Sequence, residues 1–337
     1  MSETVTRPVA TLQVLAEQVL IAAGTSAANA ASTAAALIAA ELDGLPSHGL
    51  SRIPFYADQV VSGKVRGTAV PGLTRGGPAV VHVDACDGLA YPAIDVGLAE
   101  GSRVAREMGI SAVAITRSHH CGALGYAVER MAESGLIALF FANSPAAIAP
   151  WGGRTALFGT NPIAFALPRT AATPLVIDLS LSVAARGKIM LAAEQGEPIP
   201  AGWALDAEGR PTTDAAAALA GTMLPLGGVK GAALALMVEL LAAGLTRAKF
   251  GHQASSFFDA EGAPPRVGQF ALLFDPAAFG GEAMIAHCET LLAAIADQGA
   301  RLPGERRRKT RARLRAEGIT LPRSLVDDLE RRARHGE

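Results

Sequence analysis

The sequence is poor in cysteine and has almost no excess charge. Its 337 residues include three cysteines, Cys86, Cys121 and Cys288, none of them in a CxxC pair. So sparse a set argues against a disulfide framework and suits a reducing cytoplasm. The formal net charge of −1 gives no electrostatic reason to expect nucleic acid or a charged membrane surface as a partner. We therefore expect a cytoplasmic protein with neither kind of partner.

The chain also lacks long apolar runs and the usual nucleotide motifs. No apolar segment follows a basic N-terminus, and the apolar stretch at 231–245 contains Glu239 and is too short to span a bilayer. Neither G-x-G-x-x-G after a strand nor G-x-x-x-x-G-K-[ST] occurs, so a standard Rossmann or P-loop site lacks its marks. No histidines have HxH or HxxxH spacing, and we expect no metal site.

Apolar residues are abundant. They make up 50% of the chain, against 18% charged residues, and the length corresponds to two domains at about 100–200 residues each. Hydrophobic spacing predicts helices at both ends and alternating strands and helices between them, hence a mixed α/β fold. We divide the chain into an N-terminal helical segment (1–75), a mixed α/β domain (76–285) and C-terminal helices (286–337), with both helical ends packed together. Residues 254–268 are loop-like, and we interpret them as a lid or a subunit contact.

Three ionisable or hydroxyl side chains cluster ahead of a short predicted helix. Ser47, His48 and Arg52 stand within six residues. Pro54 is tolerated in the first turn of that helix, and Ser51 is a reasonable N-cap. A serine hydroxyl beside an imidazole can relay a proton, and a guanidinium one turn further on suits a carboxylate. The alternative is a capping loop that contains a histidine by chance.

Other polar residues follow apolar runs. Asp178 ends a buried strand, where it could face a ligand or cap the next turn. His119 and His120 are adjacent on an extended chain, so only one of them can face a given ligand. Lys230 follows a glycine-rich turn, which is either an anion site or a tight loop with a surface lysine; spacing alone favours the second. We interpret the basic run at 306–315 as a solvated helix face.

Seven stretches in this order resemble one enzyme family. They are DGLPSHGLSRIPFY, SHHCGALGY, APWGG, FGTNPIAFALP, VIDLSLSVAARGK, PLGGVKGAALALMVELL and LPGERR. Together they are similar to the type-2 malate/L-lactate dehydrogenases, a non-Rossmann family, from about residue 10 to 325. The resemblance implies a mixed-sheet NAD(P)-binding and substrate domain, a helical domain built from both chain ends and a homodimer. It also accounts for the missing glycine motif.

Within that family the chain resembles two groups. The histidine pair is typical of Δ1-pyrroline-2-carboxylate/Δ1-piperideine-2-carboxylate reductases, whereas Gly122 and Gly125 are closer to the hydroxy-acid enzymes. The resemblance implies an NAD(P)H-dependent reductase of cyclic imino acids, giving L-proline or L-pipecolate by hydride transfer to C2. The alternative is a 2-hydroxy-acid dehydrogenase of the malate, lactate or sulfolactate type. A third reading, a non-catalytic homologue, is opposed by the intact polar motifs. NADPH is expected ahead of NADH.

The resemblance also assigns roles residue by residue. Ser47 and His48 become the catalytic pair, with His48 donating the proton to a small carboxylated substrate. Four residues are assigned to the substrate: Arg52, Thr160, Arg186 and Gly187. The cofactor-binding residues are expected to be His120, Cys121, Gly122, Ala123, Leu124, Asp178, Leu179, Ser180, Val229, Lys230, Arg301, Pro303, Gly304 and Glu305.

Overall fold

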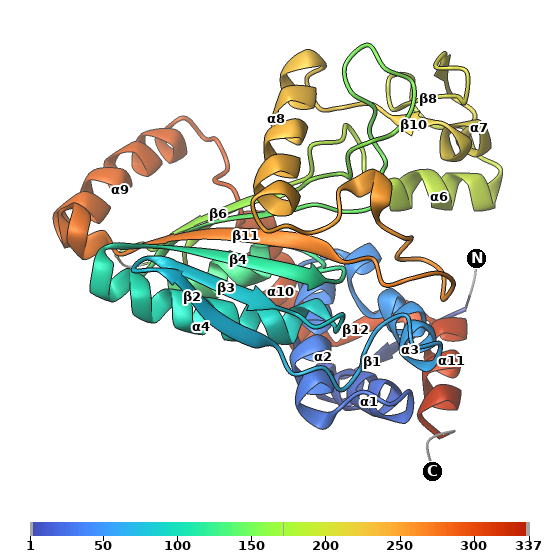
Figure 1. The fold of residues 1–337 in the computed structure, drawn as a ribbon, viewed down its shortest axis with the longest axis horizontal. Helices are drawn as coiled ribbons and strands as arrows, with labels where there is room; N and C mark the ends of the chain where they lie inside the picture. The colour runs from blue at the N-terminus through green and yellow to red at the C-terminus, as the bar shows by residue number, and fades with distance from the viewer. Residues whose placement is uncertain (1–2, 171, 335–337) are drawn as a thin grey trace.

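A seven-stranded mixed sheet forms the centre of the computed structural model, which describes residues 3–170 and 172–334 (Figure 1). The strand order is β2-β3-β4-β11-β5-β6-β7. Only β3 and β4 pair in parallel, and the other neighbours are antiparallel. The strands are β2 (Gly72–Gly77), β3 (Val80–Asp84), β4 (Ile110–Ser118), β5 (Ile137–Ala142), β6 (Ile163–Leu167), β7 (Leu175–Leu179) and β11 (Val267–Phe274). The predicted mixed α/β class is confirmed.

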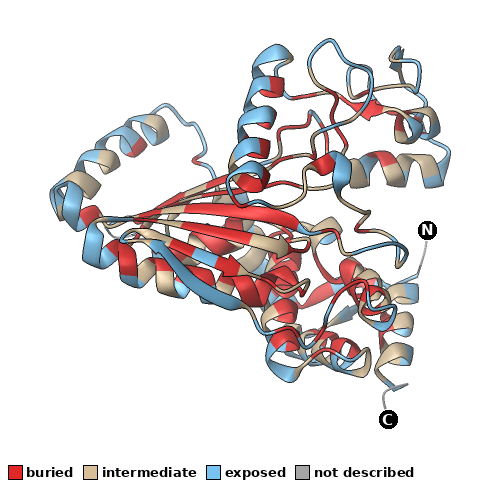
Figure 2. Ribbon diagram, in the orientation of Figure 1, coloured by how far each residue is buried: buried red, intermediate tan, exposed pale blue. Residues whose placement is uncertain are grey.

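Helices cover both faces of this sheet because its strands are apolar on both sides. Along β4, Val113 and Ile115 pack with α4 (Ala90–Met108) and α5 (Gly125–Glu133) in one core. Ala114, which points the other way, joins the core under α8 (Val229–Glu239) and the π-helical turn η3 (Leu240–Gly244). Figure 2 shows the central strands buried along most of their length. In the described part of the chain no helix is long and apolar enough to cross a membrane.

Both chain ends build a second layer of helices. Its strand pair, β1 (Thr4–Arg7) with β12 (Ile319–Pro322), joins the first described residues to the last helices. Ser26 caps the alanine-rich second helix by accepting a hydrogen bond from the Asn29 N–H at 3.4 Å. The layer contains α1 (Val9–Ala22), α2 (Ala27–Leu42), α3 (Ile53–Val61), α10 (Glu305–Glu317) and α11 (Arg323–Arg334). The prediction that the two ends pack together is confirmed.

A small lobe with its own apolar core lies within the segment predicted as one α/β domain. Ile148, Ile189 and Ile199 are among its buried side chains. Its elements are α6 (Arg186–Gln195), α7 (Ala215–Ala220), β8 (Ala204–Leu205), β9 (Pro211–Thr212) and β10 (Thr222–Met223). After β11 come the short turn η5 (Pro276–Phe279) and α9 (Gly281–Asp297), which projects from the far end of the sheet in Figure 1. The expected boundary at 75/76 falls inside β2.

The helix start predicted at Ser51 is wrong. Ser51 belongs to the 3-10 turn η2 (Leu50–Arg52), which follows a first turn, η1 (Pro46–His48), and its hydroxyl donates to the Pro46 carbonyl at 2.6 Å. Helix α3 begins only at Ile53. Two consecutive tight turns satisfy these backbone groups locally, so no side-chain cap is needed.

One arginine joins three helices across the two layers. Arg311 of α10 donates to Asp43, which follows α2, at 2.9 Å, and to both carboxylate oxygens of Glu129 in α5 at 3.1 and 2.6 Å. All three side chains are less than one-fifth exposed. Removing one partner from so enclosed an ion group leaves charges buried without compensation, which is destabilising.

We expect Arg311→Met to lower the free energy of unfolding by about 2 kcal/mol, because Asp43 and Glu129 then face each other without a cation. Urea denaturation followed by circular dichroism measures the change. Arg313→Met is the matched control, since Arg313 lies on the same helix and pairs with Glu317 in solvent; its change should stay below about 0.5 kcal/mol. Equal effects of the two substitutions would contradict the structural role of Arg311.

Candidate active site

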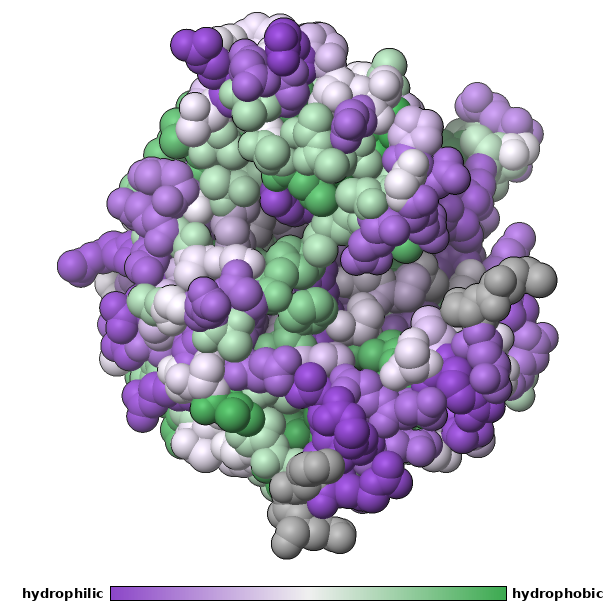
Figure 3. Space-filling view, turned by 90° about the vertical axis from the view of Figure 1, so that its right-hand side faces the viewer, coloured by the Kyte–Doolittle hydropathy of each residue, from purple (hydrophilic) through white to green (hydrophobic). Residues whose placement is uncertain are grey.

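A cavity of about 500 Å3 lies where the helical layer, the central sheet and the small lobe meet. Figure 3 shows the surface hollowed on the side turned toward the viewer, with apolar and polar residues interleaved around the hollow. The helical layer contributes Ser47, His48 and Arg52, and the small lobe contributes Arg186. The volume is in the range of sites that enclose a small molecule or part of a cofactor.

A buried carboxylate fixes the turn that carries the serine and the histidine. Glu41 in α2 accepts the Leu50 N–H at 2.7 Å. The backbone passes so close that a Cβ at Gly49 would lie 2.3 Å from a Glu41 oxygen, so any larger residue would displace the Glu41 side chain. This contact holds η1 and η2 against the helical layer and presents Ser47 and His48 to the cavity.

The three residues of the predicted cluster are brought together. The Ser47 hydroxyl lies 3.0 Å from Nδ1 of His48. Nε of Arg52 donates to the Ser47 carbonyl at 2.6 Å, and its Nη1 is buried without a hydrogen-bond partner among the described residues. Among those residues no carboxylate pairs with Arg52. The guanidinium is therefore a cation that is free to take an anionic ligand.

Charge and burial keep the His48 imidazole neutral. Burial, together with the positive charges of Arg52 and Arg307, lowers the pKa of His48 to about 4. Ser47 is the only described residue that hydrogen-bonds to the ring, through Nδ1. At neutral pH the other nitrogen, Nε2, can accept a proton if Nδ1 carries the hydrogen.

The two adjacent histidines that follow β4 both pack against Tyr56 and Phe257, but only one of them faces the cavity. His120 lines the cavity, and its Nδ1 lies 2.6 Å from the Tyr56 hydroxyl. Its ring centre is 5.8 Å from that of His48. Nε2 of His119, by contrast, bonds to the amide oxygen of Gln59 at 2.7 Å, away from the cavity. Burial lowers the pKa of both histidines, so two neutral imidazoles, His48 and His120, border the cavity.

Asp178 faces the cavity, and the backbone N–H that its carboxylate accepts belongs to a helix earlier in the chain, not to the turn that follows β7. Its carboxylate accepts the N–H of Gly125, the first residue of α5, at 2.9 Å, and it also lines the cavity. Nη1 of Arg307 lies 3.4 Å from the same oxygen. Burial raises the pKa of Asp178, and the Arg307 charge opposes that rise. An acceptor is thus held at the carboxyl end of β7, beside a helix N-terminus.

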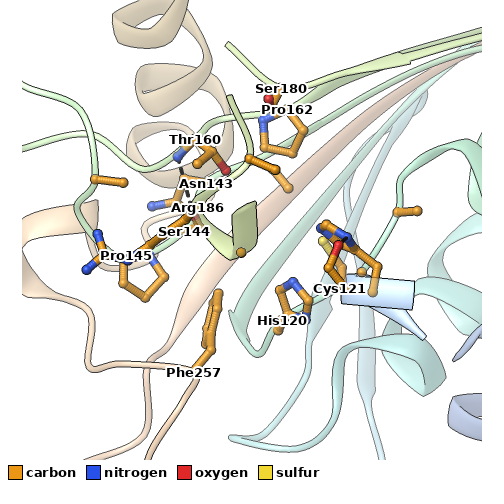
Figure 4. Close-up of a pocket in the computed structure, with 18 of the residues that line it drawn as sticks. His120, Cys121, Asn143, Ser144, Pro145, Thr160, Pro162, Ser180, Arg186 and Phe257 are labelled. Carbon is orange, nitrogen blue, oxygen red and sulfur yellow. Dashed lines mark hydrogen bonds between the residues drawn. The ribbon is translucent and has the colours of Figure 1, made fainter. Parts of the chain in front are cut away.

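Several lining residues were not found by sequence reasoning. Asn143 and Ser144 follow β5 directly, and the Ser144 hydroxyl accepts the Thr160 N–H at 3.1 Å (Figure 4). Their place after a strand was the same signal that identified Asp178. Arg307 was read as part of a solvated face, which is wrong for this residue, since its side chain is only 18% exposed and lines the cavity. Phe257 and Phe258, which also line it, lie in the loop 254–268 that was interpreted as a lid or a subunit contact, but neither was assigned to the site.

Most of the residues assigned by resemblance meet at this cavity, and seven do not. Those that line it are Ser47, His48, Arg52, His120, Cys121, Gly122, Ala123, Thr160, Asp178, Leu179, Ser180, Arg186 and Gly187. Leu124 instead packs in the core between α5 and the sheet. Val229 and Lys230 are exposed on the first turn of α8. The remaining four, Arg301, Pro303, Gly304 and Glu305, flank Leu302, which packs on the edge strand β7. Their contact with a cofactor stays a prediction.

The polar groups at the edge of the sheet fit a nicotinamide dinucleotide. A carboxylate, Asp178, and a hydroxyl, Ser180, can bond to ribose and carboxamide groups, and Arg307 offers a positive charge for phosphate. The backbone of Gly122 and Ala123 lies at the same edge. This edge is formed by the ends of β4, β5 and β7, which is where sheets of this kind bind ligands. Among the described residues no group of three or more His, Cys, Asp or Glu side chains could hold a metal ion.

Comparison with known proteins gives a consistent result. A (2R)-3-sulfolactate dehydrogenase (NADP(+)) from Chromohalobacter salexigens is 56% identical over 94% of this chain and 95% of its own. A Δ1-pyrroline-2-carboxylate reductase from Ancylobacter novellus is 42% identical over 98% of each chain. The crystal structure of Δ1-piperideine-2-carboxylate reductase from Pseudomonas syringae pv. tomato superposes with a TM-score of 0.92 at 40% identity, covering 97% of this chain and 99% of that one.

A family model shows the same relationship along almost the entire chain. The model described as malate/L-lactate dehydrogenase matches residues 8–330. The match includes the helical layer from both ends, the central sheet and the small lobe, and so all three walls of the cavity. The chain therefore belongs to the malate/L-lactate dehydrogenase family.

Proposed function

We propose that this protein is an NADP-dependent dehydrogenase of a small 2-hydroxy acid that carries a second anionic group, with 3-sulfolactate as the leading candidate. The observation that carries the proposal is a pair of arginines, Arg52 and Arg186, on one cavity. The relative that is 56% identical is named for 3-sulfolactate and NADP(+). Gly122, closer to the hydroxy-acid pattern, lines the same cavity.

Neither arginine is neutralised by the protein. Among the described residues, Arg52 has no acidic partner, and no hydrogen bond or ion pair involves the side chain of Arg186. Burial lowers the pKa of both guanidinium groups, which nevertheless stay charged at neutral pH. Two uncompensated cations favour a substrate with two negative groups, such as a carboxylate and a sulfonate.

The side chains have separable tasks in this reaction. Arg52 binds the C1 carboxylate and Arg186 the second anionic group, so that C2 is fixed between them. Nε2 of His48 accepts the proton of the 2-hydroxyl during oxidation and returns it during reduction, and Ser47 passes the proton onward from Nδ1. The chemistry that a bound nicotinamide cofactor supplies is hydride exchange with C2. The basic first turns of α10, together with the relative's name, support NADPH over NADH.

Reduction of cyclic imino acids is the second candidate, and it was the first choice from the sequence. The histidine pair supports it, as does the reductase named for Δ1-pyrroline-2-carboxylate at 42% identity. Its substrate has one carboxylate and an apolar ring, which Arg52 and Phe257 could accommodate. It leaves Arg186 without a partner, however, and for that reason we place it second.

We further propose that the enzyme acts in the cytoplasm as a homodimer. An apolar stripe runs along the outer face of α8 to the start of η3, where Leu236 is 45% exposed, Met237 39% and Leu240 54%. Exposed apolar patches of this kind commonly mark subunit contacts. Light scattering coupled to gel filtration should give a mass twice that of the 34.5 kDa chain. The double variant Leu236→Asp, Leu240→Asp should have the mass of a single chain. A wild-type monomer would contradict the proposal.

We expect the enzyme with NADPH to favour 3-sulfopyruvate over pyruvate and Δ1-pyrroline-2-carboxylate, and to be slower with NADH. Arg186→Gln should lower kcat/KM about 100-fold for 3-sulfopyruvate and less than about threefold for pyruvate, because only the first needs the second cation. Lys188→Gln, on the exposed side of α6, is the control and should change neither value. Fastest turnover of the cyclic imine would establish the second candidate instead.

We expect His48 in the free enzyme to titrate near pH 4, as its lowered pKa indicates. It is neutral above that pH and can accept the substrate proton. We therefore expect kcat/KM for hydroxy-acid oxidation to fall only as the pH drops through about 4, where His48 becomes protonated. Histidine 13Cε1 NMR measures the titration, and His48→Gln assigns the signal. Arg52→Gln should raise the His48 pKa, whereas Arg103→Gln on the surface should not. Titration near 6.5 in the wild type would refute this assignment.

A further inference from the structure

One buried lysine outside the catalytic cluster holds the loop segment 256–259. The side chain of Lys64, which follows α3, is 0% exposed. Its ammonium donates to the carbonyls of Ser256 and Asp259 at 2.8 and 3.1 Å and to the Asp259 carboxylate at 2.9 Å. Three acceptors satisfy its three protons, as burial of an ammonium group requires. Gln59 donates to the same Asp259 carbonyl at 2.8 Å.

The segment is not held by a helix or strand of its own. It lies between the short turn η4 (Gly251–Gln253) and β11, in a stretch without helix or strand. Lys64 belongs to the helical layer and is 192 positions away from Ser256 in the chain. The three hydrogen bonds of Lys64, which we call the tether, therefore join two parts of the protein that are not connected by strand pairing in the central sheet.

The tethered segment places two phenyl rings on the catalytic side chains. The Phe258 ring lies 4.5 Å from the guanidinium carbon of Arg52, and the ring centre of Phe257 lies 5.0 Å from that of His120. Figure 4 shows Phe257 beside His120 in the cavity wall. Phe258 is in turn braced edge-on by Phe55 of α3, at 5.8 Å between ring centres. One ring thus covers the free cation and the other covers the neutral imidazole.

We propose that Phe257 and Phe258 determine substrate size, and that Lys64 is the positioning residue that holds them over Arg52 and His120. Phe258 excludes water from the guanidinium, which strengthens its contact with a carboxylate. The two rings occupy the space in the cavity that a long substrate chain at C3 would need. The proposal rests on one part of the proposed function, namely that Arg52 binds the substrate carboxylate.

Hydrogen exchange tests the tether without any substrate. In Lys64→Met the amides of residues 256–259 should exchange about tenfold faster, because their carbonyls lose a donor and local opening becomes easier. Lys64→Arg should restore part of the protection. Lys249→Met is the matched control, since Lys249 donates to Pro264 at the other end of the same loop; it should leave 256–259 unchanged. Wild-type exchange in Lys64→Met would overturn the positioning role.

Kinetics test the consequence. Lys64→Met should raise the KM of the carboxylated substrate about tenfold, with kcat falling less than about threefold and the KM for NADPH unchanged. Phe257→Ala and Phe258→Ala should raise the ratio of kcat/KM for 2-oxohexanoate over pyruvate about tenfold. Phe279→Ala, far from the cavity, should not. A ratio that stays constant in both cavity variants would refute the specificity role, even if Lys64→Met failed to fold.

The two proposals can fail separately. If no 2-oxo acid is reduced, the 2-hydroxy-acid function fails, but the exchange measurement still reports on the tether. The KM for Δ1-pyrroline-2-carboxylate then replaces that of the oxo acid, because this substrate also has a carboxylate for Arg52. An unchanged KM in Lys64→Met for whichever substrate is turned over counts against the tether.

Discussion

Arg52 is a buried cation for which the described structure provides no counter-ion, and the arrangement of the cavity depends on it. Burying an unpaired charge is unfavourable, so the surrounding groups must hold it. The Ser47 carbonyl accepts from Nε, and the Phe258 ring covers one face. The same charge contributes to the lowered pKa of His48. A bound carboxylate would neutralise Arg52, so substrate binding and the proton chemistry of His48 are electrostatically coupled.

The cavity exists only because three parts of the chain meet. Glu41 in the helical layer fixes the backbone before Arg52, β7 brings Asp178, and the small lobe adds Arg186. Helix α10 joins them from the C-terminal end. Its residues Arg307 and Arg311 lie one turn apart on its inner face, one lining the cavity and the other linking α2 to α5. A run of basic residues that looked uniform is therefore divided by helical periodicity into a solvated face and a structural one.

The part of the site that sequence reasoning found was local in the chain. Ser47, His48 and Arg52 are neighbours, and their chemistry could be inferred from residue type and spacing. Asp178 was identified because it ends an apolar strand. Phe257, Phe258 and Lys64 gave no such signal, since an aromatic pair in a loop and a single lysine have the composition of ordinary surface segments. Their importance comes from contacts that span almost 200 positions, and one sequence contains no information on which distant segments touch.

The sequence by itself determined the fold class, the helical layer from both ends and the family, because hydrophobic periodicity and seven ordered motifs are properties of the linear chain. It also indicated that only one of His119 and His120 can face a given ligand, and of the two only His120 lines the cavity. Tertiary structure alone decided which cations remain unpaired at the cavity. Arg52, Arg186, Arg307 and Arg311 are chemically identical side chains, and only packing distinguishes them. Arg307 and Arg311 pair with acidic side chains from elements far away in the sequence, whereas Arg52 and Arg186 have no acidic partner among the described residues.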